Sequence, residues 1–271
     1  MRSMAIGDIH GCSTALNSLL AGVQISSQDI VVVLGDLVDR GPDSRAVLER
    51  LLQLATEVNL IAIRGNDEDM LLQSLERGTP RMMWIGAGAK ATLESYGGGL
   101  EAIPHHHLDF VTSMPRYWQT DTHIFVHANI DPDVEMEDQA DVWLRWHSLT
   151  GEEVRHRSGK TVICGHTGLK NGLPAYTDGF VCIDKFRCQI RYVDVLGHDV
   201  AGTVFCTANI VDWNDVYVEE ICNRAGLKRD ELSFLSFHRT GLHGPSSRIS
   251  CPSSGFAVQS FDSLRFVAVS V

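Results

Sequence analysis

Candidate metal ligands follow a series of short apolar runs in this chain. The six residues are Asp8, His10, Asp36, Asn66, His127 and His166. Carboxylate and amide oxygens together with imidazole nitrogens suit two adjacent divalent cations, with one carboxylate able to bridge them. A single histidine after a strand is more often a structural residue. The whole set, in this order, favours a pair of metal ions.

The stretch Gly35–Gly41 contains two carboxylates and the guanidinium of Arg40, and it follows the apolar run Ile30–Leu34. Such a run is typical of a buried parallel strand, and ligands bind at the carboxyl ends of such strands. The stretch taken alone is also compatible with an ordinary strand-to-helix turn, since glycine, aspartate and proline are common turn residues. Because similar sequences surround Asp8 and Asn66, we favour a chemical role.

Repeated strand-loop-helix units must position these residues. Leucine and valine at helical spacing predict helices over Cys12–Val23, Asp43–Ala55 and Asp67–Leu75, with Asp43 or Ser44 capping the second. Apolar runs before each loop predict the strands. The sequence therefore predicts an α/β fold with a β-α-β-α-β core, whose ligands lie at the carboxyl edge of the sheet.

Later segments predict further elements. Tyr117–Val126 is expected to form a strand pair that turns near Asp121, and Gln139–His147 is expected to be helical or turn-like. Four short alternating segments predict a second, antiparallel sheet packed on the first; they are Ala175–Thr177, Phe180–Asp184, Gln189–Val195 and Gly202–Thr207. The run His105–His107 is expected to be a solvated loop rather than a metal site, because adjacent histidines point in different directions.

Composition is typical of one enzyme domain. The chain has 271 residues, of which 44% are hydrophobic and 21% are charged, so it can bury a large core. The net charge of −11 argues against sequence-independent nucleic-acid binding, which needs a basic face. Seven scattered cysteines argue against a disulfide framework and favour a cytoplasmic location, and no apolar run is long enough for a membrane span. We expect a domain over residues 1–210 and an extension over 211–271 that packs on it and includes a helix at Asp215–Ala225.

Three motifs and two isolated histidines establish a family resemblance. They are Gly7-Asp8-Ile9-His10-Gly11, Gly35-Asp36-Leu37-Val38-Asp39-Arg40-Gly41, Gly65-Asn66-Asp67-Glu68, His127 and Gly165-His166. Between about Met4 and Asn209 the chain resembles the calcineurin-like metallophosphoesterases of the phosphoprotein phosphatase family. It is most similar to the small bacterial and phage-type serine/threonine protein phosphatases, with symmetrical diadenosine tetraphosphatases as near relatives. This resemblance implies two packed mixed β-sheets flanked by helices.

The resemblance also implies roles for individual residues. One metal would bind Asp8, His10 and Asp36, and the other would bind Asp36, Asn66, His127 and His166. Arg40, Arg145 and Asn66 would bind the phosphate, and a hydroxide bridging the metals would attack phosphorus directly, without a phosphoenzyme. Mn²⁺ is the metal expected in assays, although Fe, Zn²⁺ and Co²⁺ suit the same ligands.

Asp67 departs from the family pattern. The family has a histidine at this position, read as the general acid, and the residue that would support it is Asp39. If the two carboxyl groups lie close together, repulsion raises one pKa and the pair can share and donate a proton. Alternatively the metals keep both groups ionised and no acid is available. Asp67 as an additional metal ligand is a third interpretation.

Three functions are therefore compatible with the sequence. The main hypothesis is a serine/threonine protein phosphatase or phosphomonoesterase, acting on a phosphorylated protein or a small phosphoester. The first alternative is a dinucleoside polyphosphate hydrolase, whose phosphate leaving groups depend less on an acid. The second is a metal-binding or phosphate-binding protein with impaired catalysis. Neither a nucleic-acid partner nor a membrane is expected.

Overall fold

The computed structural model describes residues 3–23, 25–75, 79–168 and 174–184 and six later strands at 192–196, 199–200, 203–206, 249–250, 257–258 and 266–269. The predicted helix Asp215–Ala225 lies outside these residues. Within the described part of the chain, no helix is both long enough and apolar enough to cross a membrane.

The first sheet contains the strands that precede three of the motifs. Its order is β10-β9-β1-β2-β3, from strands Asp199–Val200, Tyr192–Leu196, Ser3–Ile6, Ile30–Val33 and Asn59–Ala62. Strands β1, β2 and β3 are parallel, with Ile6 opposite Val33 and Val33 opposite Ala62. The three strands therefore end level, and the loops that follow them leave from the same edge of the sheet.

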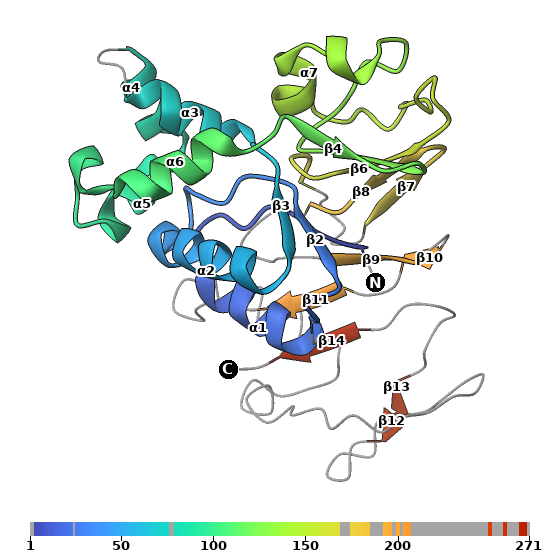
Figure 1. Cartoon of the computed structure of the whole chain (residues 1–271), viewed down its shortest axis with the longest axis horizontal. Helices are drawn as coiled ribbons and strands as arrows, with labels where there is room; N and C mark the ends of the chain where they lie inside the picture. Colours follow the sequence, from blue (N-terminus) through green and yellow to red (C-terminus); the bar gives the residue numbers. More distant parts are fainter. Residues whose placement is uncertain are drawn as a thin grey trace.

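The predicted helices of this half are confirmed, with ends that differ by at most two residues. They are α1 (Ser13–Val23), α2 (Ser44–Glu57) and α3 (Asn66–Ser74). Asp43 caps α2 by accepting a hydrogen bond from the backbone N–H of Ala46 at 2.9 Å. Figure 1 shows α1 and α2 adjacent to each other beside the first sheet.

Side-chain alternation along β2 divides the core into two layers. Val31 and Val33 face a cluster that includes helix residues such as Leu16 and Leu48. Val32, one position on, packs in a separate cluster with second-sheet residues such as Phe125 and Ile163. This period of two is what a strand covered on both faces requires. The two sheets thus pack face to face, and helices cover the outer face of the first.

The second sheet differs from the prediction in its topology. Its order is β4-β5-β6-β8-β7, from strands Tyr117–Gln119, His123–Val126, Thr161–Cys164, Phe180–Cys182 and Ala175–Thr177. Strands β5, β6 and β8 are parallel, and β4 and β7 add antiparallel edges. The prediction that the four late segments form one antiparallel sheet was wrong. Two of them, β7 and β8, pair with each other in this sheet, but β9 joins the first sheet. The fourth, β11 (Thr203–Cys206), pairs with β14. The expected α/β fold with two mixed sheets is confirmed.

The prediction that His105–His107 form a solvated loop was also wrong. These residues begin helix α6 (His105–Ser113), and Pro104, whose backbone is extended, is the N-cap residue. His107 faces inward and is fully buried, and its Nδ1 lies 2.6 Å from the hydroxyl of Tyr96. Histidines 105 and 106 are exposed. The turn of the helix therefore separates a structural histidine from its two neighbours.

Shorter elements complete the described part of the chain. They are α4 (Thr79–Trp84), a π-helical turn η1 (Ile85–Ala89), α5 (Lys90–Ser95), the 3₁₀ turns η2 (Leu100–Ala102) and η3 (Met136–Asp138), and α7 (Asp141–Trp146). Helix α7 packs Leu144 on the outer face of the second sheet, in the region predicted to be helical or turn-like. Strand β14 (Phe266–Val269) pairs in parallel with β11, and β12 (Ile249–Ser250) pairs with β13 (Ala257–Val258). The domain boundary at residue 210 stays a prediction.

Candidate metal centre

The backbone is strained at the predicted site. Among the described residues, the non-glycine positions with positive φ are His10, Asp36, Asp39, Arg40 and His166, with φ between 44° and 66°. Residues other than glycine rarely adopt this backbone conformation, and such strain is concentrated at functional sites. All five residues belong to the motifs that the sequence singles out, so the strain and the candidate chemistry coincide.

The first ligand group is formed by Asp8, His10 and Asp36, which follow β1 and β2. One ligand atom from each lies within 4.8 Å of the others. Nε2 of His10 is 3.9 Å from a carboxylate oxygen of Asp8 and 3.8 Å from one of Asp36. Two carboxylates and one imidazole suit a divalent cation such as Mn²⁺, Fe²⁺ or Zn²⁺.

The second ligand group is formed by Asp36, Asn66, His127 and His166. Nε2 of His127 lies 3.0 Å from Oδ1 of Asn66, 3.1 Å from Nδ1 of His166 and 3.4 Å from Oδ1 of Asp36. Because Asp36 contributes to both groups, its two oxygens are placed to bridge two cations. The structure therefore brings all six predicted ligands together, although their role in binding metal stays a prediction.

Backbone carbonyls orient both histidines of the second group. Nδ1 of His127 donates to the carbonyl of Leu34 at 2.8 Å, and Nε2 of His166 donates to the carbonyl of Trp146 at 3.2 Å. Each neutral imidazole then turns the lone pair of its other nitrogen toward the partner histidine. The lone pairs of the two imidazoles and the amide oxygen of Asn66 therefore face one another with no proton between them, and a bound cation would stabilise this arrangement. Metal-binding histidines commonly donate their other N–H to a backbone carbonyl in this way. The residues fit a metal.

Burial shifts the acidity of these groups in opposite directions. It raises the pKa of Asp36 to about 6, helped by the charge of Asp67, and it raises the pKa of Asp8 well above the usual range, helped by Asp184. Burial lowers the pKa of His127 and His166 to about 4, which keeps both imidazoles neutral. Burial also opposes a charge on His10, but the contact with Asp67 and the charge of Asp36 outweigh it and raise that pKa to about 9.

Glu68 fixes the loop that carries Asp36. Its two oxygens accept hydrogen bonds from the backbone N–H groups of Asp36, Leu37 and Gly65 at 2.7–2.9 Å. Gly35 makes this packing possible, because its φ is +104° and a Cβ there would lie 2.6 Å from the nitrogen of Gly65. The loop after β2 and the start of α3 are thus tied together, which sets Asp36 and Asn66 side by side.

Arg40 lies at the rim of the first group. Its Nη1 is 3.0 Å from Nε2 of His10, its Nη2 is 3.4 Å from Oδ1 of Asp67, and its side chain is 51% exposed. The backbone N–H of Arg40 donates to the carbonyl of Gly88, where a Cβ would lie 2.9 Å from the arginine side chain. This accessible guanidinium suits an anionic group placed near the metals.

Asp39 has partners that the sequence analysis did not identify. Its carboxylate accepts hydrogen bonds from Nε1 of Trp84 at 2.6 Å and from the hydroxyl of Thr92 at 2.7 Å. Burial and the charge of Asp67 raise its pKa to about 7. Among the hydrogen bonds of the described residues, none joins Asp39 to Asp67. The hypothesis of a shared proton has no such contact to support it.

Asp67 contacts one residue of each ligand group. Its Oδ1 accepts a hydrogen bond from Nδ2 of Asn66 at 2.7 Å, which turns the amide oxygen of Asn66 toward His127. Its Oδ2, which is buried and lacks a hydrogen bond, lies 3.3 Å from Nδ1 of His10. The carboxylate is therefore placed to orient Asn66 and His10.

Arg145 is held by carboxylates. Its Nη1 lies 3.3 Å from Asp69 on α3 and 2.9 Å from Asp141 on α7, and the residue is 4% exposed. These ion pairs occupy Nη1 of Arg145. Phosphate binding by this residue stays a prediction. No spacing in the sequence pointed to Asp69 or Asp141. Trp84 and Thr92 lie in a stretch that resembles the family, which was a usable signal for the partners of Asp39.

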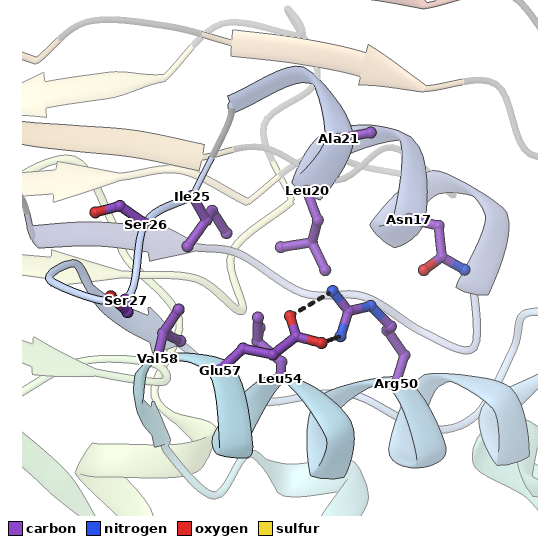
Figure 2. Close-up of a pocket in the computed structure, with 10 residues that line it drawn as sticks. All are labelled: Asn17, Leu20, Ala21, Ile25, Ser26, Ser27, Arg50, Leu54, Glu57 and Val58. Atoms are coloured by element: carbon purple, nitrogen blue, oxygen red, sulfur yellow. Dashed lines mark hydrogen bonds and ion pairs between the residues drawn. The ribbon is translucent and has the colours of Figure 1, made fainter.

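A cavity of about 490 Å³ lies away from the metal centre (Figure 2). Residues from α1, α2 and the segment Ile25–Ser27 line it, and Arg50 and Glu57 form an ion pair there. Both helices begin near the ligand loops and run away from them. The cavity is consequently near the amino ends of β2 and β3, at the opposite edge of the sheet.

Comparisons with known proteins agree with this geometry. A family model described as calcineurin-like phosphoesterase matches residues 1–202. The symmetrical bis(5'-nucleosyl)-tetraphosphatase of Acidovorax sp. (strain JS42) is 45% identical over 82 residues, covering 30% of this chain and 28% of the relative. The corresponding enzyme of Janthinobacterium sp. (strain Marseille) is 31% identical over 134 residues, covering 49% and 45%. Serine/threonine-protein phosphatase 1 of Salmonella typhimurium is 38% identical over 84 residues, covering 31% and 37%.

Solved structures show the same fold at low identity. One described as a candidate diadenosine tetraphosphatase has a TM-score of 0.55 at 22% identity, covering 73% of this chain and 91% of that one. A serine/threonine phosphatase from Saccharomyces cerevisiae has a TM-score of 0.53 at 15% identity, covering 79% and 77%. The chain spans less than half the length of the curated relatives named above. Since the family model matches most of its residues, the chain belongs to the calcineurin-like phosphoesterase family.

Proposed function

We propose that this chain hydrolyses the phosphoanhydride bonds of dinucleoside polyphosphates with two divalent metal ions. Relatives with 31–45% identity carry the name symmetrical bis(5'-nucleosyl)-tetraphosphatase. The motifs alone had favoured a phosphomonoesterase, and these relatives favour the alternative. The observation that carries the proposal is the environment of Asp67.

Asp67 stands where the family places a histidine as general acid, and its contacts suit a different task. Oδ1 is engaged by Asn66 and by Arg40, and Oδ2 faces His10. With both oxygens directed at these neighbours, the Asp67 side chain is placed to orient them rather than to protonate a leaving group. A phosphate leaving group needs little protonation, whereas an alkoxide needs a great deal. The site therefore suits an anhydride better than a phosphoserine.

The metals would be held by the first and second ligand groups, with Asp36 in both. When bound, two divalent cations neutralise phosphate charge and supply a hydroxide nucleophile near neutral pH. Arg40 would bind a non-bridging phosphate oxygen from the exposed rim, and Asp67 would keep His10 and Asn66 in position. Mn²⁺ in assays and a cytoplasmic location are part of the proposal.

A second candidate function is phosphomonoester hydrolysis, as in a serine/threonine protein phosphatase. The complete Gly35–Gly41 motif and the Salmonella phosphatase, 38% identical over 84 residues, favour it. Both candidates use the same ligands and differ in the leaving group, so a comparison of substrates separates them.

The test measures kcat/KM of the Mn²⁺-loaded protein on diadenosine tetraphosphate, a phosphoserine peptide and an aryl phosphate. We expect cleavage of the dinucleotide and the aryl ester, and slow cleavage of the peptide. Asp67→His should raise the rate on the peptide about a hundred-fold or more, the usual contribution of a positioned acid, with a small effect on the dinucleotide. Asp67→Asn is the matched control and should bring no gain on the peptide.

The opposite pattern would overturn the proposal. If the unaltered protein cleaves the phosphoserine peptide efficiently and leaves the dinucleotide intact, it is a phosphomonoesterase. If no substrate is cleaved although two metal equivalents are bound, the protein has a binding role instead.

A further inference from the structure

Helix α7 ends in an exposed tryptophan, Trp146, whose backbone contacts the second ligand group. Trp146 is 42% exposed and Val142, one helical turn earlier, is 58% exposed. Among the tryptophans that the structure describes, Trp84 is buried and Trp118 and Trp143 are partly buried, which makes Trp146 the exposed one. The rings of Trp118 and Trp143 pack against Phe125 and His147, whereas no ring contact of Trp146 is found within the described residues.

The end of α7 is fixed to the metal-binding loops through the backbone. The carbonyl of Leu144 accepts a hydrogen bond from Ala128, next to His127, at 2.9 Å. The carbonyl of Trp146 itself accepts from Nε2 of His166 at 3.2 Å. The residue that orients a candidate metal ligand is thus the one that presents the exposed ring. Figure 1 shows α7 at the end of the second sheet, above β4.

This placement suits a ligand that has a flat aromatic group a short distance from a phosphate. A chain with a net charge of −11 offers little general attraction to a polyphosphate, so affinity must come from local contacts. An indole supplies such a contact to any nucleobase, because every base has a π-face on which it can stack. A phosphoserine peptide has no aromatic group at a fixed distance from its phosphate.

We propose that Trp146 is a stacking surface for one base of a dinucleoside polyphosphate whose phosphates bind at the two ligand groups. This inference rests on the proposed function, since it names a contact for the same substrate. The second base is left to other contacts. Trp146 acts in binding and takes no part in bond cleavage.

The test measures equilibrium binding, which is independent of turnover. Isothermal titration calorimetry of the Mn²⁺-loaded protein would use a non-hydrolysable, methylene-bridged diadenosine tetraphosphate. We expect Trp146→Ala to weaken binding about ten- to a hundred-fold, as loss of a base-stacking aromatic does, and Trp146→Phe to retain most of the affinity. Val154→Ala, at a loop residue that is 60% exposed, is the control and should bind normally.

Tripolyphosphate, which has no base, is the second probe. Trp146→Ala should bind it as the unaltered protein does, because the metals and Arg40 are intact. If Trp146→Ala weakens both probes equally, the residue supports the fold of α7 and the inference is wrong. If it weakens neither while the unaltered protein cleaves diadenosine tetraphosphate, the proposed function stands and this inference fails. If Trp146 governs binding of the analogue and no cleavage occurs, the stacking surface stands and the proposed function fails.

Discussion

The two ligand groups share Asp36 but differ in how their protons are arranged. In the second group, His127 and His166 each donate one N–H hydrogen bond to a backbone carbonyl, and both are neutral because their pKa values are about 4. In the first group, Nδ1 of His10 also lies 3.2 Å from a backbone carbonyl, that of Val38, but the pKa of His10 is about 9 and the guanidinium of Arg40 lies 3.0 Å from its ligand atom Nε2. The second group is prepared for a cation, whereas the first must lose a proton and move an arginine.

This difference predicts an order of metal uptake. The second group should bind its cation first and more tightly, and the first group should fill later. Three changes test the comparison, beginning with the one that should have the largest effect.

Removal of His127 should eliminate the second cation and almost all activity. We expect His127→Ala to bind about one metal equivalent in place of two and to lose about a thousand-fold or more in kcat, because each cation supplies several kcal/mol of transition-state stabilisation. Metal content after equilibrium dialysis and steady-state kinetics measure the two effects. His123→Ala, four residues earlier on β5, is the control. Two retained equivalents in His127→Ala would contradict the ligand assignment.

Metal affinity should depend on pH in the first group and very little in the second. A cation binds only the neutral form of His10, and the neutral fraction falls about tenfold for each pH unit below its pKa of about 9. First-group affinity should therefore rise about fifty-fold from pH 7 to pH 9, where half of the His10 side chains are neutral. The second group should change little over this range, because His127 and His166 are already neutral. Calorimetric titration of the metal-free protein in buffers of different ionisation enthalpy measures the protons released at each step.

Equal proton release at the two binding steps would contradict the expected difference between the two ligand groups. Release of protons at the weaker step, and of none at the stronger, would assign the weaker step to the first group, in which the pKa values of both His10 and Asp8 are raised.

Replacement of Arg40 should have the smallest of the three effects on metal uptake. Arg40→Met removes a positive charge beside His10, and we expect first-group affinity to increase by about tenfold or less, because the side chain is half exposed and solvent screens it. Arg40→Lys keeps the charge and is the control. Turnover of the fully loaded Arg40→Met protein should decrease, since the guanidinium no longer contacts phosphate. If Arg40→Met leaves the metal affinity of the first group unchanged, the charge of Arg40 does not oppose cation binding there.

The sequence was most informative where local pattern decides structure. The strands and helices of the first half were predictable because Val31–Val33 form a buried run and because apolar residues at helical spacing define α1 and α2. The candidate ligands were predictable as a set because parallel strands that end level bring the following loops to one edge. The topology of the second sheet was not predictable, because short strands such as β7 and β9 carry no mark of the sheet they join.

Contacts between distant segments account for the other differences. Asp39 meets Trp84 and Thr92, which are 45 and 53 residues away, and Arg145 meets Asp69, which is 76 residues away. Partners at such separations depend on the packing of whole helices, which single-residue patterns do not record. His107 was misjudged for a related reason, since its burial follows from the docking of α6 beside Tyr96.

The level ends of β1, β2 and β3 also determine where the chain can accept new sequence. An added residue within β2 would shift Asp36 by about 3.3 Å and turn its side chain to the other face, which would dismantle both ligand groups at once. An insertion between α1 and β2, near Ser26 and Ser27, enters at the opposite edge and leaves the register intact. That turn is consequently the place in the first half at which a peptide tag or a fused domain should be tolerated.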